Sequence, residues 1–169
     1  MLVPQVVGMT AESVSEGKSV GGRWLTYDAI RDYIKSLKDE TLRERLTKIL
    51  ELVESNQLAV FKRGPTKSPL IRIRSAILKS TEPLFTISCG DGYVNVNIGL
   101  VYREVFTPEF ARALVEELKQ AGLLPSDFDP DDVQYNKGLL FRVNEMSDEK
   151  FEKFMEILKK YCVQESGQA

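Results

Sequence analysis

The sequence predicts an α+β fold in which helices pack on the apolar face of an antiparallel sheet of about five strands. Two stretches with helical apolar spacing come first, and a central run of Val, Ile, Phe and Thr then alternates apolar and polar residues with a period of two. Two further helical stretches flank one more alternating segment near the C-terminus. We therefore expect the order ααββββαβα in a chain of 169 residues, which is the usual size of one domain.

The first two helices follow from apolar stripes on one helical face. In the first, Ala29, Ile30, Tyr33 and Ile34 share a face, and Thr26 is placed to cap its start. The second stripe comprises Leu42, Leu46, Ile49, Leu50 and Val53, and this helix is expected to end near Ser55-Asn56.

Five strands are expected from the alternation and from the turn residues between them. The expected strands are Leu58–Lys62, Leu70–Ile77, Leu84–Cys89, Tyr93–Gly99 and Gly138–Asn144. Gly64, Pro65 and Pro69 interrupt pairing between the first two, which predicts a hairpin. Gly90-Asp91-Gly92 predicts a tight turn, because Asp and Gly readily adopt the positive φ that such turns require.

The remaining helices have clear start and stop signals. Thr107-Pro108-Glu109 is typical of a helix N-terminus, Gly122 of a C-terminus, and Ser147 is expected to cap the last helix. A long loop is expected over Leu123–Asn136. The domain is expected to span 23–163, between a flexible N-terminal arm at 1–22 and a disordered tail at 164–169.

One core should bury the inward-facing residues of these elements. They are Phe85, Ile87, Val94, Val96, Phe110, Leu114, Phe151, Phe154 and Leu158.

The composition excludes much catalytic chemistry. Histidine is absent, which removes Ser-His-Asp and Cys-His nucleophiles and histidine-ligated metals. Cys89 and Cys162 have no metal-ligand spacing and are expected to be buried free thiols, with a disulfide as the alternative. Neither a cofactor nor a metal is expected.

Two acidic features have the residue types of a catalytic or metal site but not the pattern. Glu117-Leu118-Lys119 matches a nuclease-like motif but falls in an expected helix, where residues two apart do not face one partner. The loop residues Asp127, Asp129, Asp131 and Asp132 lack the calcium-site glutamate and are interpreted as caps and turn formers. No catalytic residue is therefore assigned.

The charge distribution gives the main functional signal. The chain has a net charge of −2, yet the segment between Ser55 and Thr81 carries six basic residues and no acidic one. These are Lys62, Arg63, Lys67, Arg72, Arg74 and Lys79. A basic hairpin of this kind can grip phosphates, whereas the plainer interpretation is that the cations protect an edge strand and keep the surface soluble.

Strand alternation also predicts one polar side of the sheet. That side would carry Arg72, Arg74, Thr86, Ser88, Tyr93, Asn95, Asn97, Arg142 and Asn144. Such a side could contact bases or phosphates, with Tyr93 as a stacking platform, or it could be an ordinary solvated face.

The segment Leu84–Gly99 (LFTISCGDGYVNVNIG), followed by ALVEELKQAGLLP, resembles an uncharacterised prokaryotic domain with an aromatic strand, a DG turn and a strand ending in Gly. This resemblance covers roughly Leu42–Cys162. It implies a setting near restriction and defence nucleases and supplies no catalytic residue.

We therefore expect a non-enzymatic binding module of the prokaryotic cytoplasm that contacts nucleic acid, and DNA in particular. The expected contact residues are Lys62, Arg63, Lys67, Arg72, Arg74, Tyr93, Asn95, Asn97 and Arg142. The alternatives are a regulatory domain that docks a larger protein and, more remotely, a metal-dependent nuclease. No membrane association is expected, and the oligomeric state is left open.

Overall fold

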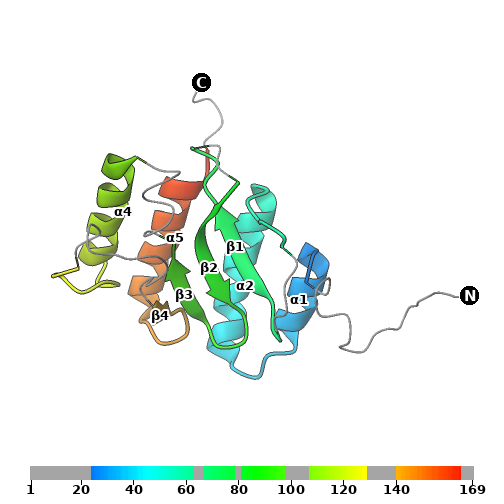
Figure 1. Cartoon of the computed structure of the whole chain (residues 1–169). Helices are drawn as coiled ribbons and strands as arrows, with labels where there is room; N and C mark the ends of the chain where they lie inside the picture. The colour runs from blue at the N-terminus through cyan, green and yellow to red at the C-terminus, as the bar shows by residue number, and fades with distance from the viewer. Residues whose placement is uncertain (1–23, 63–66, 79–80, 98–106, 129–139, 165–169) are drawn as a thin grey trace, which may run out of the picture.

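The computed structural model describes residues 24–62, 67–78, 81–97, 107–128 and 140–164, and these form four helices and four strands (Figure 1). The elements are α1 (Tyr27–Lys35), α2 (Glu40–Ser55), β1 (Leu70–Arg74), β2 (Pro83–Ser88), β3 (Tyr93–Val96), α4 (Pro108–Gln120), β4 (Leu140–Arg142) and α5 (Asp148–Cys162). The α+β class is confirmed. The expected arm at 1–22 and most of the expected tail lie outside the described residues.

Each helix begins at a side chain that accepts a hydrogen bond from the first turn. Thr26, Thr107 and Ser147 cap α1, α4 and α5, as the sequence predicts. Asp39 caps α2 and accepts from the Leu42 amide at 3.0 Å. Gly122 follows the C-terminus of α4 with φ +77°, a conformation that L side chains rarely adopt.

The strands form one antiparallel sheet in the order β1-β2-β3-β4. The turn between β2 and β3 is the expected Gly90-Asp91-Gly92, where Gly92 has φ +79° and its amide donates to Ser88 O at 2.8 Å. A Cβ at Gly92 would lie 2.7 Å from Asn144 Oδ1 and 2.9 Å from Leu42 Cδ1. Glycine at this turn therefore permits both the backbone conformation and close packing against the start of α2.

The sheet has four strands within the described residues, rather than the expected five. Leu58–Lys62 is not a strand, because only the bridge from Ala59 to Ile73 and two flanking backbone hydrogen bonds join it to β1. The next residues, Phe61 and Lys62, are exposed. This segment pairs with one neighbour over a few residues and then leaves the sheet.

The strand expected over Leu70–Ile77 ends earlier, at Arg74. Beyond Arg74 the chain binds the end of α5 instead of β2: Ser75 Oγ donates to Tyr161 O at 2.5 Å, and the Ala76 amide donates to Cys162 O at 2.8 Å. The fourth and fifth expected strands are each longer than observed: β3 ends at Val96, before Asn97, and β4 ends at Arg142, after which Val143 and Asn144 belong to a turn. Residues 98–99 and 138–139 lie outside the described ranges.

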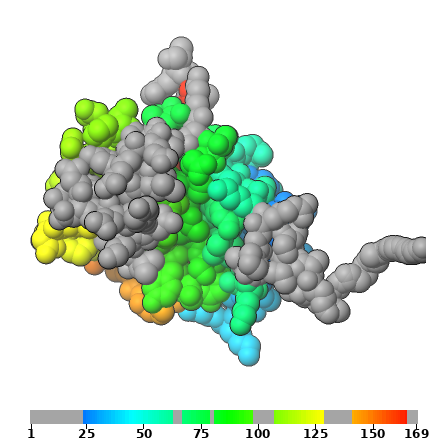
Figure 2. Space-filling model, viewed as in Figure 1, coloured from blue at the N-terminus to red at the C-terminus, as the bar shows by residue number. Residues whose placement is uncertain are grey.

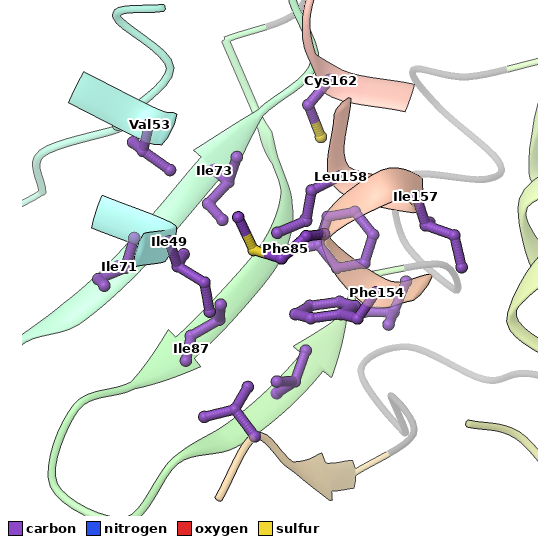
Figure 3. Packing of buried hydrophobic residues seen from close by; sticks show 14 of the residues in the cluster. Ile49, Val53, Ile71, Ile73, Phe85, Ile87, Phe154, Ile157, Leu158 and Cys162 are labelled. Atoms are coloured by element: carbon purple, nitrogen blue, oxygen red, sulfur yellow. The ribbon is translucent and has the colours of Figure 1, made fainter. Parts of the chain in front are cut away.

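The core lies between the sheet and the pair α2 and α5, with α1 beside α2 and α4 beside α5 (Figure 1). In Figure 3, Ile49 and Val53 of α2 and Phe154 and Leu158 of α5 point toward the apolar side of the strands. Eight of the nine expected core residues are buried. The ninth, Phe110, is half-buried and packs edge-on against Tyr161, with 5.3 Å between the ring centroids.

Arg45 of α2 is the buried cation that ties this core to the connection between β4 and α5. Its guanidinium donates to Val143 O at 2.6 Å, Met146 O at 2.7 Å and Asp148 Oδ1 at 2.6 Å. It also lies over the Phe151 ring, 5.1 Å from the centroid. One side chain thus fixes the turn that carries the end of the sheet into the last helix.

Both thiols lie in the core. Cys89 and Cys162 are free and fully buried, and burial raises the pKa of each to about 12. Among the described helices, none combines the length and apolar content that crossing a bilayer demands.

Phe154→Ala is expected to lower the free energy of unfolding by about 3–5 kcal/mol, because it removes a fully buried ring from the centre of the core. Urea unfolding followed by circular dichroism measures this change. Phe61→Ala is the matched control, since Phe61 is 37% exposed and its loss should cost below about 1 kcal/mol. Equal costs for the two variants would contradict the described core.

Arg45→Ala is expected to destabilise the fold by about 3 kcal/mol, because two carbonyls lose charge-assisted hydrogen bonds. Asp148→Asn should cost less than about 1 kcal/mol, because that carboxylate is almost fully exposed to solvent. The same urea assay compares the two variants. A larger loss in Asp148→Asn would mean that the ion pair, rather than the carbonyl hydrogen bonds, carries the stability.

The thiols are expected to resist alkylation in the folded protein. Because burial raises the pKa of both to about 12, few thiolates form near pH ~8, and the thiolate is the reactive species. Mass spectrometry after iodoacetamide treatment should show no added group on the native chain and two groups after unfolding without reductant. An unlabelled chain after unfolding would instead indicate a disulfide.

Candidate nucleic-acid interface

The polar side of the sheet lies opposite α2 and α5 and holds six of the nine expected contact residues. Strand pairing places Arg72 opposite Thr86 and Thr86 opposite Asn95, in one row across three strands. Tyr93 and Arg142 form a pair in the next row. Figure 2 views the molecule from this side, and strand atoms, in green, form part of its surface. We call this surface the polar sheet face; it comprises Arg72, Arg74, Thr86, Ser88, Tyr93, Asn95, Asn97 and Arg142.

Arg72 is the most unusual residue of this face. Its side chain is half-buried, and burial lowers the pKa of its guanidinium. Within the described residues it makes no ion pair and no side-chain hydrogen bond. Arginine nevertheless stays protonated at neutral pH, so Arg72 holds a partly desolvated positive charge without a counter-ion from the described chain.

The other cations of the basic segment have different surroundings. Arg74 lies on the same side of β1 and donates to Gln57 O at 3.0 Å. Lys62 is exposed and lies 3.9 Å from Glu82, an exposed pair that contributes little. Lys67 is exposed, whereas Arg63 and Lys79 lie outside the described residues. Arg72 and Arg74 are thus the pair whose placement on the face is defined.

Asn95 and Asn97 differ although they follow each other on the same side. Asn97 Nδ2 donates to Pro83 O at 3.0 Å and to Thr86 Oγ1 at 3.2 Å, which ties the ends of β2 and β3 together. Asn95 Oδ1 is buried and has no donor among the described residues. Asn97 thus uses its amide within the chain, whereas Asn95 Oδ1 has neither a described donor nor exposed surface.

Tyr93 and Arg142 contact each other through a cation–π interaction and a hydrogen bond. The Arg142 guanidinium lies 4.1 Å from the Tyr93 ring centroid, and one of its Nη atoms donates to Tyr93 Oη at 2.7 Å. The other Nη donates to Glu145 at 2.8 Å, and this bond raises the pKa of Arg142. Arg142 Nε is buried without a described acceptor. One face of the Tyr93 ring is thus covered, which limits the stacking expected of it.

Asn144 does not belong to the polar sheet face, although the alternation places it there. β4 ends at Arg142, and Asn144 Nδ2 donates to the Asp39 cap of α2 at 3.0 Å. The hydrogen bonds from Leu42 and Asn144 lower the pKa of Asp39. Asn144 is therefore a structural residue that links the end of the sheet to α2.

Lys150 is a neighbouring cation that the sequence pattern does not reveal. It belongs to α5, beside the connection that follows Arg142, and it makes no ion pair within the described residues. Strand alternation concerns only residues of one strand, so it gives no signal for a cation from the following helix.

The described residues do not show the acidic strand positions or the ligand cluster of a metal-dependent nuclease. None of the four strands carries an acidic side chain, and Glu117-Leu118-Lys119 lies within α4, as expected. Among the residues searched, no group of three or more potential ligands converges on a point. Asp127 is exposed, while Asp129, Asp131 and Asp132 lie outside the described residues.

The polar sheet face is therefore an arrangement of cations, amides and hydroxyls on one side of a sheet, with Arg72 and Asn95 in the same row. Comparison with protein-family models, curated proteins and solved structures gives no match for this chain.

Proposed function

We propose that this chain is a non-enzymatic binding module that contacts nucleic acid through the polar sheet face and the basic segment beside β1. The observation that carries the proposal is the half-buried Arg72 without a counter-ion in the described chain. Partial desolvation of an unpaired charge costs free energy, and a phosphate from a ligand would offset that cost with a charge-assisted hydrogen bond.

The neighbouring polar atoms favour a nucleic acid over a simple anion. Within the described chain, Asn95 Oδ1 is an acceptor without a donor, and Arg142 Nε is a donor without an acceptor. An anion alone could satisfy only the donor. A nucleobase edge carries both amino donors and carbonyl or ring-nitrogen acceptors. It could therefore satisfy both kinds of atom once the side chains of Asn95 and Arg142 turn outward from their buried positions.

DNA bound inside a cell is the ligand class we propose, in keeping with the two buried thiols and a cytoplasmic setting. The resemblance of Leu84–Gly99 to a prokaryotic domain found near restriction and defence nucleases favours a supporting role in such a system. In that role the module would hold DNA, and a separate protein would cut it.

A double variant, Arg72→Ala with Arg74→Ala, is expected to lower the affinity for DNA and to make that affinity less sensitive to salt concentration. Fluorescence anisotropy of a labelled DNA oligonucleotide over a series of salt concentrations measures both. The slope of log affinity against log salt should fall in magnitude by about 0.7–0.9 for each phosphate that the variant no longer neutralises, or about one to two for the pair.

The matched control removes one cation from α2 and one from α1, which lies beside it, both away from the polar sheet face. Lys35→Ala with Lys48→Ala changes the net charge by the same amount at exposed positions of α1 and α2, and should leave the slope nearly unchanged. Equal slopes for wild type and a folded Arg72/Arg74 variant would refute the interface and favour the protein-docking alternative.

A further inference from the structure

A small hollow of about 230 Å³ adjoins the polar sheet face at its β4 end. It lies where the C-terminus of α4, the strand β4 and the first turn of α5 meet. Its lining includes Leu123, Phe141, Arg142, Glu145, Met146 and Lys150. Arg142 belongs to both the hollow and the polar sheet face, so the two surfaces are continuous. We call this hollow the β4 hollow.

The β4 hollow combines apolar side chains with positive charge. Leu123 is buried, and Phe141 and Met146 are partly buried against the core, so apolar atoms line part of it. Lys150 adds an ammonium without an ion pair in the described chain. A Cβ built on Gly122 would lie 3.1 Å from Lys150 Cε and 3.4 Å from its Nζ. Glycine at position 122 therefore lets the lysine side chain lie close against the backbone.

The larger hollow between α4 and α5, about 420 Å³, is a weaker candidate. Its cations are already neutralised, because Lys160 lies 2.5 Å from Glu117 and Lys153 lies 3.9 Å from Glu149. It also has no residue in common with the polar sheet face. The β4 hollow is the one that a ligand on that face would reach.

The volume of the β4 hollow and the charges of its lining residues indicate which chemical group it could bind. Sites for whole small molecules usually enclose about 300–1,000 Å³, so this hollow suits one planar group of a longer ligand. Glu145 binds Arg142 through Oε2, and its Oε1 has no described partner. A carboxylate in the lining disfavours a phosphate inside the hollow but accepts a hydrogen bond from the amino group of a base.

We infer that the β4 hollow receives one unpaired base of a single-stranded DNA, while Lys150 contacts an adjacent phosphate. The base would stack on Phe141 and Met146, and only an unpaired strand can present it, because bases within a duplex are stacked and paired. This inference rests on the proposed nucleic-acid function and narrows its ligand to the single-stranded form.

The test compares a labelled mixed-sequence DNA oligonucleotide with its duplex by anisotropy at matched salt. Wild type should bind the single strand at least about tenfold more tightly, since stacking of even one base contributes substantially. Lys150→Ala should weaken single-strand binding about fivefold and reduce the salt slope by about 0.7, the value for one phosphate contact on a single strand.

Lys153→Ala is the matched control, because it removes the same charge from the same helix at the edge of the other hollow. It should change the affinity less than about twofold. A second probe carries 2-aminopurine, whose fluorescence reports base stacking. Its signal should change on binding to wild type, and this change should shrink in Met146→Ala even at saturating protein.

The outcomes separate this inference from the proposed function. Two results would overturn base binding in the β4 hollow: tighter binding of the duplex, or equal effects of Lys150→Ala and Lys153→Ala. If Arg72→Ala with Arg74→Ala still weakens binding in that case, the proposed nucleic-acid interface stands. An unchanged 2-aminopurine signal in Met146→Ala would also overturn it. No binding of either DNA form by folded wild type would refute both.

Discussion

The guanidinium of Arg45 is the group on which the candidate interface depends. It reaches from α2 to two carbonyls of the connection between β4 and α5, 98 and 101 residues later in the chain. Those carbonyls belong to Val143 and Met146, which follow Arg142 and precede Lys150. Because a planar guanidinium fixes the direction of its partners, Arg45 sets where the edge of the sheet ends and where α5 begins. The cations on either side of this turn are therefore positioned by a residue that lies in the core.

One side of the sheet needs apolar side chains and the other needs polar ones, and the alternation of apolar and polar residues along each strand supplies both. Ile71, Ile73 and Phe85 face the helices, where close packing excludes water. Their neighbours Arg72 and Thr86 face the other way and need hydrogen-bond partners instead. A shift of one residue in strand register would exchange these sides, so the apolar core holds the polar row in register. The strand register that buries the apolar side chains therefore also fixes the positions of the polar side chains on the opposite side.

The sequence allowed the class, the helices, the turn at Gly90–Gly92 and the polar side to be predicted, because each depends on local periodicity or on turn chemistry. It did not predict which polar residues are already occupied. Arg142 is bound by Glu145 and Tyr93, and Asn97 by Pro83 and Thr86, through hydrogen bonds that depend on how strands and turns meet. Arg45 lies at the edge of the apolar stripe of α2, three residues after Leu42 and four before Ile49, and this local pattern does not identify its partners, which come from a distant segment. Long-range hydrogen bonds leave no periodic signal in a single sequence.

A stable fold would normally satisfy the polar atoms that the sheet face leaves without partners. Asn95 Oδ1 and Arg142 Nε on the face, and Asn144 Oδ1 beside the start of α2, are buried without described partners. Arg72 loses hydration without gaining a counter-ion from the described chain. Each of these groups costs free energy, and none of them packs the core, so stability alone does not explain their presence. Arg72 lies on β1 and Arg142 on β4, the two edge strands, with Asn95 on β3 between them. The three residues share one face, and of these only Arg142 borders the β4 hollow, where Lys150 has no ion pair in the described chain. On the proposed function, a ligand that places an anion beside Arg72 and hydrogen-bonds to Asn95 and Arg142, once their side chains turn outward, would offset that cost.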